Sequence, residues 1–154
     1  MHVKANSSGE DLPSTPNEPP VAGLVELTIP VGSDLLVLAR LAASTVASRS
    51  AFDIEEIEDL RLAVDELCLS VLNGRRTGTL LLRFDGQPDQ IEVWCLYDGT
   101  SVASDDNVRT DDDDPETGDL SGRILDALVD EHGPAILDGR TGARLCKRRA
   151  HHDA

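Results

Sequence analysis

The sequence predicts an α+β fold, a two-layer sandwich in which helices cover one face of a mostly antiparallel sheet. Two helix-type segments follow each other directly, pairs of strand-type segments stand on either side of a third helix, and turn residues join the strands of each pair. The expected order over residues 22–149 is β-α-α-β-β-α-β-β. Helices with one apolar stripe must bury it against another layer, which predicts the sandwich.

The first part of the chain is expected to hold a tail, a strand and a helix. Residues 1–21 are rich in Pro, Ser, Asn and Glu and predict a disordered tail, because they cannot bury enough apolar surface to order themselves. Alternating polar and apolar residues predict a strand over 23–29. Ser33 is a favourable N-cap for the helix that should then run to about Arg49.

The second helix carries the clearest start and stop signals. Asp53 and Glu56 form a D-x-x-E capping signature, and Asn73-Gly74 is a typical helix end. Its apolar residues recur three and four positions apart, which predicts one buried stripe: Ile57, Leu60, Val64, Leu67 and Val71.

The remaining elements follow from β-rich runs and turn residues. Residues 79–84 and 91–96 predict a hairpin. A short third helix is expected from Ile124, and Gly133-Pro134 should stop it. Two final strands are expected near 135–137 and 143–147, followed by a tail over 150–154.

Residues 100–120 predict an acidic loop. They hold eight carboxylates and a single Arg, without hydrophobic periodicity. The simplest interpretation is a solubilising loop. Two sharper ones are a mimic that competes for a basic partner surface and a calcium site, although the spacing is not that of a calcium-binding D-x-D-x-D-G loop.

Composition narrows the class of partner. The chain has 154 residues, of which 40% are hydrophobic but only 3% aromatic, so one domain with an aliphatic core is expected. A net charge of −15 disfavours DNA, RNA and anionic membranes, and it suits a basic protein partner. Without a membrane-length apolar run or a signal peptide, we expect a cytoplasmic protein. The three cysteines, which form no CxxC pair, predict reduced thiols.

Several segments together resemble one ATPase superfamily. They are DLRLAVDELC at 59–68, ALVDE at 127–131, GARLCKRR at 142–149 and Arg40 after an apolar run. Over roughly residues 22–149 the chain resembles the GHKL ATPase (Bergerat) fold, and within it the bacterial anti-sigma factor and serine-kinase branch. The resemblance implies a homodimer and a partner contact at Arg40, which by itself could be an ordinary surface residue.

The resemblance also implies a nucleotide site, which this sequence keeps only in part. Glu66 takes the position of the general base, although alone it could be a solvated helix residue. Ser70 stands where the family has a magnesium-binding Asn. In the adenine-reading motif D-x-G-x-G, Tyr97 stands at the Asp position, Gly99 keeps the first Gly and Ser101 replaces the second, unless Asp98 shifts by one residue to supply the Asp. Such a shift would point Asp98 to the other face of its strand.

The phosphate-binding part departs further. Of the second glycine box only Gly122 remains, displaced, and Ala143 replaces a Thr on the last strand. Two unit charges about 4 Å apart interact by roughly 4 kcal/mol at an effective dielectric of about 20, so the acidic loop should repel a triphosphate. We therefore expect no metal and no cofactor, with Mg·ATP binding weak or lost.

Two functions of different class remain. The first is an anti-sigma factor that sequesters an alternative sigma factor and is released by an anti-anti-sigma antagonist, which needs only a folded surface. The alternative is an active ATP-dependent serine/threonine kinase that phosphorylates the antagonist. A third, a partner switch whose vestigial pocket holds another small ligand, has less support.

Overall fold

The computed structural model describes residues 2–6, 23–99 and 115–150 of the chain. In these residues the elements are β1 (His2–Asn6), β2 (Gly23–Pro30), the 3-10 turn η1 (Ser33–Leu35), α1 (Leu36–Arg49), α2 (Ile54–Leu72), β3 (Thr79–Gly86), β4 (Gln90–Asp98), α3 (Pro115–Leu128), β5 (Glu131–Leu137) and β6 (Arg140–Arg148). Residues 100–114 of the expected acidic loop lie outside the described residues, and its remaining residues, 115–120, belong to α3 instead.

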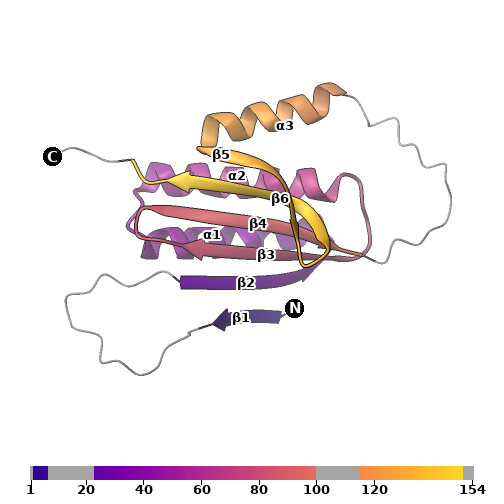
Figure 1. The fold of residues 1–154 in the computed structure, drawn as a ribbon, viewed down its shortest axis with the longest axis horizontal. Helices are drawn as coiled ribbons and strands as arrows, with labels where there is room; N and C mark the ends of the chain where they lie inside the picture. The colour runs from indigo at the N-terminus through magenta and orange to yellow at the C-terminus, as the bar shows by residue number, and fades with distance from the viewer. Residues whose placement is uncertain (1, 7–22, 100–114, 151–154) are drawn as a thin grey trace.

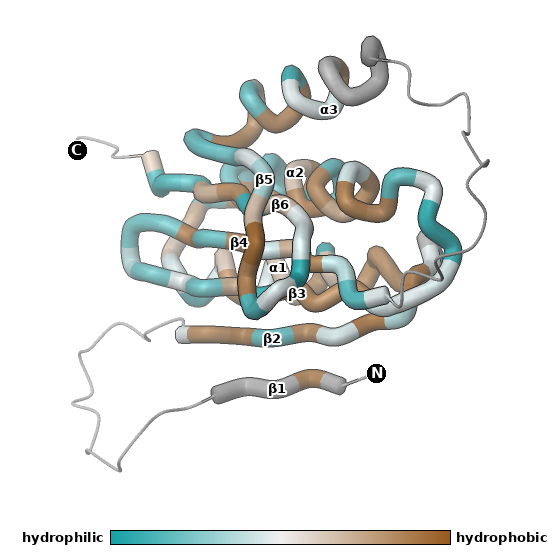
Figure 2. Tube along the Cα trace, turned by 45° about the vertical axis from the view of Figure 1, so that its right-hand side comes forward, coloured by the Kyte–Doolittle hydropathy of each residue, from teal (hydrophilic) through white to brown (hydrophobic). Residues whose placement is uncertain are grey.

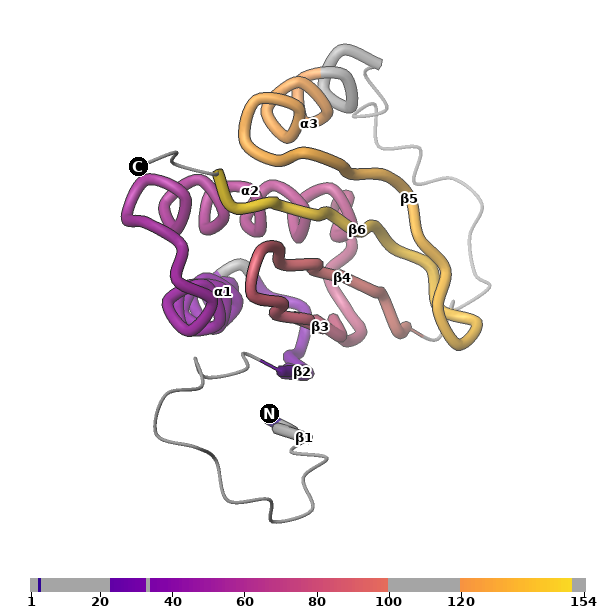
Figure 3. Tube along the Cα trace, turned by 60° about the vertical axis from the view of Figure 1, so that its left-hand side comes forward, coloured from indigo at the N-terminus to yellow at the C-terminus, as the bar shows by residue number. Residues whose placement is uncertain are grey.

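The strands form one six-stranded sheet in the order β1-β2-β3-β4-β6-β5, and every neighbouring pair is antiparallel. Figures 1 and 3 show α1 and α2 side by side on one face of this sheet, with α3 beyond α2 and next to β5. The expected two-layer α+β sandwich is confirmed. No helix in the described part of the chain is both long and apolar enough to cross a membrane.

The core lies between the helices and the sheet. Figure 2 shows hydrophobic segments along β2 and on the helices. In β3 and β4 every second residue is buried, including Leu82, Phe84, Val93 and Cys95. The side chains between them therefore point to the opposite face of the sheet, as strand alternation requires. The buried residues of the core are mostly aliphatic, as the composition predicted, and two phenylalanines and three cysteines complete them.

The caps of α2 form as expected. The Asp53 carboxylate accepts a hydrogen bond from the Glu56 backbone N–H at 2.8 Å, and Glu56 accepts one from the Asp53 N–H at 2.9 Å. Asn73 ends the helix in a left-handed conformation, with φ 40°. Gly74 follows at φ 77°, which glycine adopts without a steric penalty.

Three sequence expectations need correction near helix ends. Ser33 does not cap α1: it begins the 3-10 turn, and the N-cap is Leu35, which makes no side-chain cap. The third helix begins at Pro115 rather than Ile124, since proline suits a first helical turn. Gly133-Pro134 does not stop that helix but lies within β5, where an edge strand tolerates a residue without an N–H donor.

The expected tails also need correction. Residues 2–6 of the proposed disordered tail form β1, which pairs with β2. Without β1, the edge strand β2 would expose unpaired backbone N–H and C=O groups, which can pair with another strand. The prediction of a tail rested on composition alone and did not consider this pairing. Ala150, assigned to the C-terminal tail, donates its N–H to Glu56 at 2.8 Å. Residues 7–22 and 151–154 lie outside the described residues.

Candidate functional site

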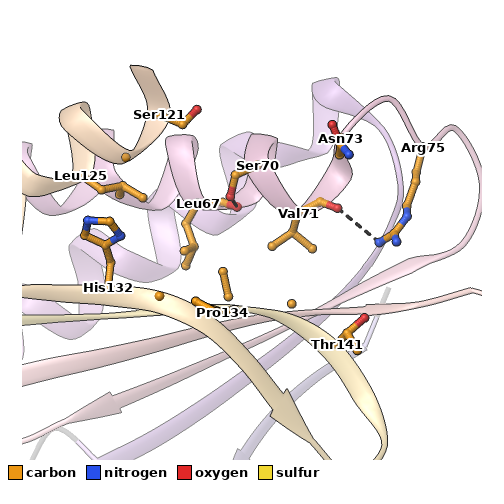
Figure 4. A pocket seen from close by; sticks show the side chains of 14 residues that line it. Leu67, Ser70, Val71, Asn73, Arg75, Ser121, Leu125, His132, Pro134 and Thr141 are labelled. Carbon is orange, nitrogen blue, oxygen red and sulfur yellow. Dashed lines mark hydrogen bonds between the residues drawn. The ribbon is translucent and has the colours of Figure 1, made fainter. Parts of the chain in front are cut away.

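A pocket of about 450 Å³ opens between α2, α3 and the β5–β6 hairpin. Its floor is aliphatic: Leu67 and Val71 come from α2, Leu125 from α3 and Ala143 from β6. Figure 4 shows the side chains of Leu67, Val71 and Leu125 pointing into this space. A volume in this range and a mostly apolar wall are typical of small-molecule sites.

Polar groups lie around the pocket wall. Hydroxyls come from three elements, in Ser70, Ser121 and Thr141, while Asn73 and Arg75 follow the end of α2 and His132 lies on β5. His132 Nε2 is 2.6 Å from Asp126 Oδ1, so the imidazole connects β5 to α3. No carboxylate lines this pocket among the described residues.

Glu66 is half-buried and belongs to a contact between two helices. The Ser121 hydroxyl of α3 donates a hydrogen bond to Glu66 Oε1 on α2. Glu66 is not one of the residues that line the pocket, whereas its partner Ser121 is. The residue in the general-base position therefore stands beside the pocket and holds α3 against α2.

Ser70 lines the pocket one turn after Glu66, as the spacing predicted. Its hydroxyl donates to the backbone carbonyl of Leu67 at 2.8 Å. This bond within α2 directs the hydroxyl proton back to the helix.

Tyr97 packs its ring against the helix side of the sheet at the end of β4. Its hydroxyl donates to the Thr77 carbonyl at 2.7 Å, and the Arg75 guanidinium lies 4.1 Å from the ring centroid. A Cβ added to Gly99 would lie 2.1 Å from the Tyr97 oxygen, and one added to Gly78 would lie 2.7 Å from it. Both glycines therefore make room for the tyrosine.

Asp98 points elsewhere. Its Oδ2 lies 3.2 Å from the Arg140 guanidinium of β6, and it does not line the pocket. The one-residue shift that would bring Asp98 into the place of the adenine-reading Asp is absent from this arrangement, because Tyr97 takes the helix side of β4. Gly122 and Ala143 do line the pocket. Ser101, in the adenine-reading segment, is outside the described residues.

Arg40 lies away from the pocket, between the two long helices. Its Nε is 3.5 Å from Asp65 Oδ1 on α2, and the two side chains are 39% and 32% exposed. Of the residues predicted from sequence, the pocket is therefore lined by Ser70, Gly122 and Ala143, and Arg40 lies apart from it.

Sequence reasoning missed several pocket residues. Asn73 was interpreted only as a helix-end residue, yet it lies at the pocket with Arg75 because the helix that carries Ser70 ends there. Ser121 adjoins Gly122, so the glycine-box position could have indicated it. Thr141 and His132 reach the pocket through the β5–β6 pairing, which no local pattern gives.

Comparison with known proteins identifies the family. No family model matches the chain. Serine-protein kinase RsbW of Bacillus subtilis is 29% identical over 124 residues, which cover 71% of this chain and 76% of that protein. Serine-protein kinase RsbW of Bacillus velezensis is 30% identical over 121 residues, covering 70% and 74%. Serine-protein kinase RsbW of Bacillus pumilus is 30% identical over 149 residues, covering 84% and 91%. The chain belongs to the family of the serine-protein kinase RsbW.

Proposed function

We propose that the protein is an anti-sigma factor: it binds and sequesters an alternative sigma factor in the cytoplasm, and an anti-anti-sigma antagonist releases it. The observation that carries this proposal is an exposed apolar surface around Arg40 and Asp65. We call it the helix-pair face and define it by six residues of α1 and α2: Val37, Arg40, Leu41, Leu62, Asp65 and Leu69.

The helix-pair face has the composition of a protein interface. Its four aliphatic side chains are 44% to 57% exposed, although the helices have a complete buried stripe on their other side. Exposed apolar groups gathered beside a charged pair mark binding surfaces more often than single exposed residues do. An Arg within such a patch can anchor a partner carboxylate through two parallel hydrogen bonds. The net charge of −15 favours encounter with a basic DNA-binding partner.

The residues of the pocket fit Mg·ATP poorly. In the positions where the family resemblance implies a metal-binding amide and an adenine-reading carboxylate, the chain has Ser70 and Tyr97. The Ser70 hydroxyl bonds to its own helix, and the Tyr97 ring is held between Thr77 and Arg75. These contacts support weak or lost nucleotide binding, and sequestration does not require it.

Kinase activity toward the antagonist is the second candidate, because the relatives are named serine-protein kinases. Glu66 would be its general base. Transfer of phosphate to a serine of the antagonist, lost in Glu66→Gln, would establish it. A homodimer is also part of the proposal, and sedimentation velocity of the purified chain tests it.

The proposed sigma-binding surface is tested by charge substitution. Leu41→Asp should weaken binding of the cognate alternative sigma factor by about tenfold or more, because interface residues with large effects cost about 2 kcal/mol. Ile136→Asp is the matched control, since Ile136 is 73% exposed on the edge strand β5. Equal affinities for both variants in calorimetric titration would exclude the helix-pair face.

A further inference from the structure

A second hollow adjoins the helix-pair face and has an unusual charge for this chain. It measures about 410 Å³ and lies where the chain leaves β2 and where α2 ends. Its apolar wall is Val31, Leu69 and Leu72, and its polar wall is Arg75 and Arg76. We call it the arginine groove. Leu69 belongs to both surfaces, so the two are continuous.

The backbone fixes the shape of the arginine groove. Asn73 and Gly74 both have positive φ, which turns the chain sharply after α2 and brings the two arginines to the helix end. On the other side, the Val31 N–H donates to the Gly78 carbonyl at 2.9 Å and holds the segment after β2. The walls are therefore built by a helix cap and a backbone hydrogen bond.

The charge of the groove is opposite to that of the chain. Arg76 lines it together with Arg75, which also lines the first pocket, and none of its lining residues in the described part of the chain carries a carboxylate, although the chain has a net charge of −15. Asp34 is a described carboxylate nearby: its Oδ1 would lie 2.9 Å from a Cβ on Gly32, another lining residue. With Asp34 counted, the described residues at the groove still carry a net positive charge.

The two arginines differ in their freedom. Arg75 stacks on Tyr97 and lies 3.4 Å from the Val71 carbonyl, so its position is set by the fold. Arg76 is exposed and makes no ion pair or hydrogen bond with the described residues. One fixed and one adaptable cation beside an exposed Leu69 match a ligand that carries carboxylates next to aliphatic groups.

We infer that the arginine groove binds an acidic, apolar segment of a partner protein, such as one turn of an amphipathic helix with Glu beside Leu. The inference rests on one premise of the proposed function, namely that a protein partner binds at the helix-pair face next to the groove. A basic sigma-factor surface would be repelled by two arginines, so the groove suits a different segment from the one that the acidic surface attracts.

The test uses a short fluorescent helical peptide with Leu and Glu at helical spacing, and a counterpart in which every Glu is Lys. Fluorescence anisotropy at low salt gives the affinities. Arg76→Glu should lower the affinity for the Glu peptide by about tenfold, because reversing a rim charge replaces attraction with repulsion. The affinity of Arg76→Lys for the Glu peptide should stay within about twofold of the wild-type value.

Arg83→Glu is the matched control, since Arg83 alternates with buried Leu82 and Phe84 and faces away from the helices. It should leave the affinity within about twofold. Amide shifts of the labelled protein on peptide addition should cluster at Val31, Gly32 and Gly74. Equal losses in Arg76→Glu and Arg83→Glu, tighter binding of the Lys peptide, or shifts confined to other residues would overturn the proposal.

Two further measurements distinguish peptide binding at the groove from a dimer contact and from the proposed sigma-factor binding. A wild-type dimer that dissociates in Leu69→Ser would assign the groove to a second copy of the chain and overturn the peptide proposal. A wild-type chain that binds the Glu peptide at the groove but no sigma factor would retain the groove and contradict the proposed function. A wild-type chain that binds the sigma factor but not the Glu peptide would retain the proposed function and overturn the inference about the groove.

Discussion

The Ser121 hydroxyl of α3 donates a hydrogen bond to Glu66 on α2, so the carboxylate in the general-base position connects two helices. Lys147 of β6 holds the other end of α3, because its Nζ lies 2.8 Å from the Leu128 carbonyl. The position that the resemblance assigns to a general base thus has a structural use in this chain.

Removing the Ser121 hydroxyl should loosen α3. Ser121→Ala should lower the free energy of unfolding by about 1 kcal/mol and speed hydrogen exchange of the α3 amides, since a hydrogen bond to a charged group is lost. Ser70→Ala is the control: its hydroxyl bonds only its own helix, so stability should change by less than about 0.5 kcal/mol. Equal α3 exchange in both variants would contradict this role.

Gly99 should be required only because Tyr97 is present. Gly99→Ala should destabilise the protein by more than about 1 kcal/mol, because the new Cβ would overlap the phenol ring. In a Tyr97→Ala background the same change should cost much less, giving a coupling energy of about 1 kcal/mol or more in a double-mutant cycle. Additive effects in denaturant titrations would show that Gly99 has another role.

Two glycines on neighbouring strands should respond differently to alanine. A Cβ on Gly142 of β6 would lie 1.9 Å from the Cys95 carbonyl oxygen of β4, and backbone cannot move aside easily. Gly142→Ala should therefore cost about 3 kcal/mol or more. Gly133→Ala on β5 meets nothing within 4 Å and should change stability by less than about 1 kcal/mol. Thermal unfolding of both variants measures the contrast.

The protein should lose stability in alkali through Cys68. A hydrogen bond with Cys95, whose Sγ is 3.9 Å away, and complete burial raise the pKa of the Cys68 thiol well above its ordinary value. Above about pH 8.5 the unfolded thiol loses its proton while the folded one keeps it, so the unfolded state is favoured. Below that pH this contribution is constant.

The contribution of the Cys68 thiol is measured by the slope of the unfolding free energy against pH. One proton difference corresponds to about 1.4 kcal/mol per pH unit. We expect urea titrations at a series of pH values from 8 upward to show that the free energy of unfolding falls less steeply with pH in Cys68→Ala than in the wild type. Identical slopes would mean that other groups cause any alkaline loss.

Local signals in the sequence predicted the parts of the fold that local chemistry determines. The Asp53–Glu56 capping box and the Asn73-Gly74 end of α2 need only residues within one turn, and both are confirmed. Pro134 misled the prediction because its tolerance depends on β5 being an edge strand. That position is a property of the whole sheet.

The pocket was predictable only along α2. The four-residue spacing placed Glu66 and Ser70 on the same face of α2. It could not show that the Ser121 hydroxyl donates to the Glu66 carboxylate or that the Ser70 hydroxyl donates to the Leu67 carbonyl. The Arg75–Tyr97 stack joins residues 22 positions apart in sequence, because the β3–β4 pairing brings the end of β4 back beside the start of β3. Such contacts follow from tertiary packing rather than from a motif.

The most direct test of nucleotide-independent sequestration is the affinity of the purified chain for its cognate alternative sigma factor, measured by calorimetry with and without Mg·ATP. We predict binding in both conditions with affinities within about twofold of each other, because a ligand without differential affinity cannot shift an equilibrium. Glu66→Ala should bind the sigma factor as the wild type does. Sigma binding that requires Mg·ATP, or that is lost in Glu66→Ala while the variant remains folded, would contradict the account.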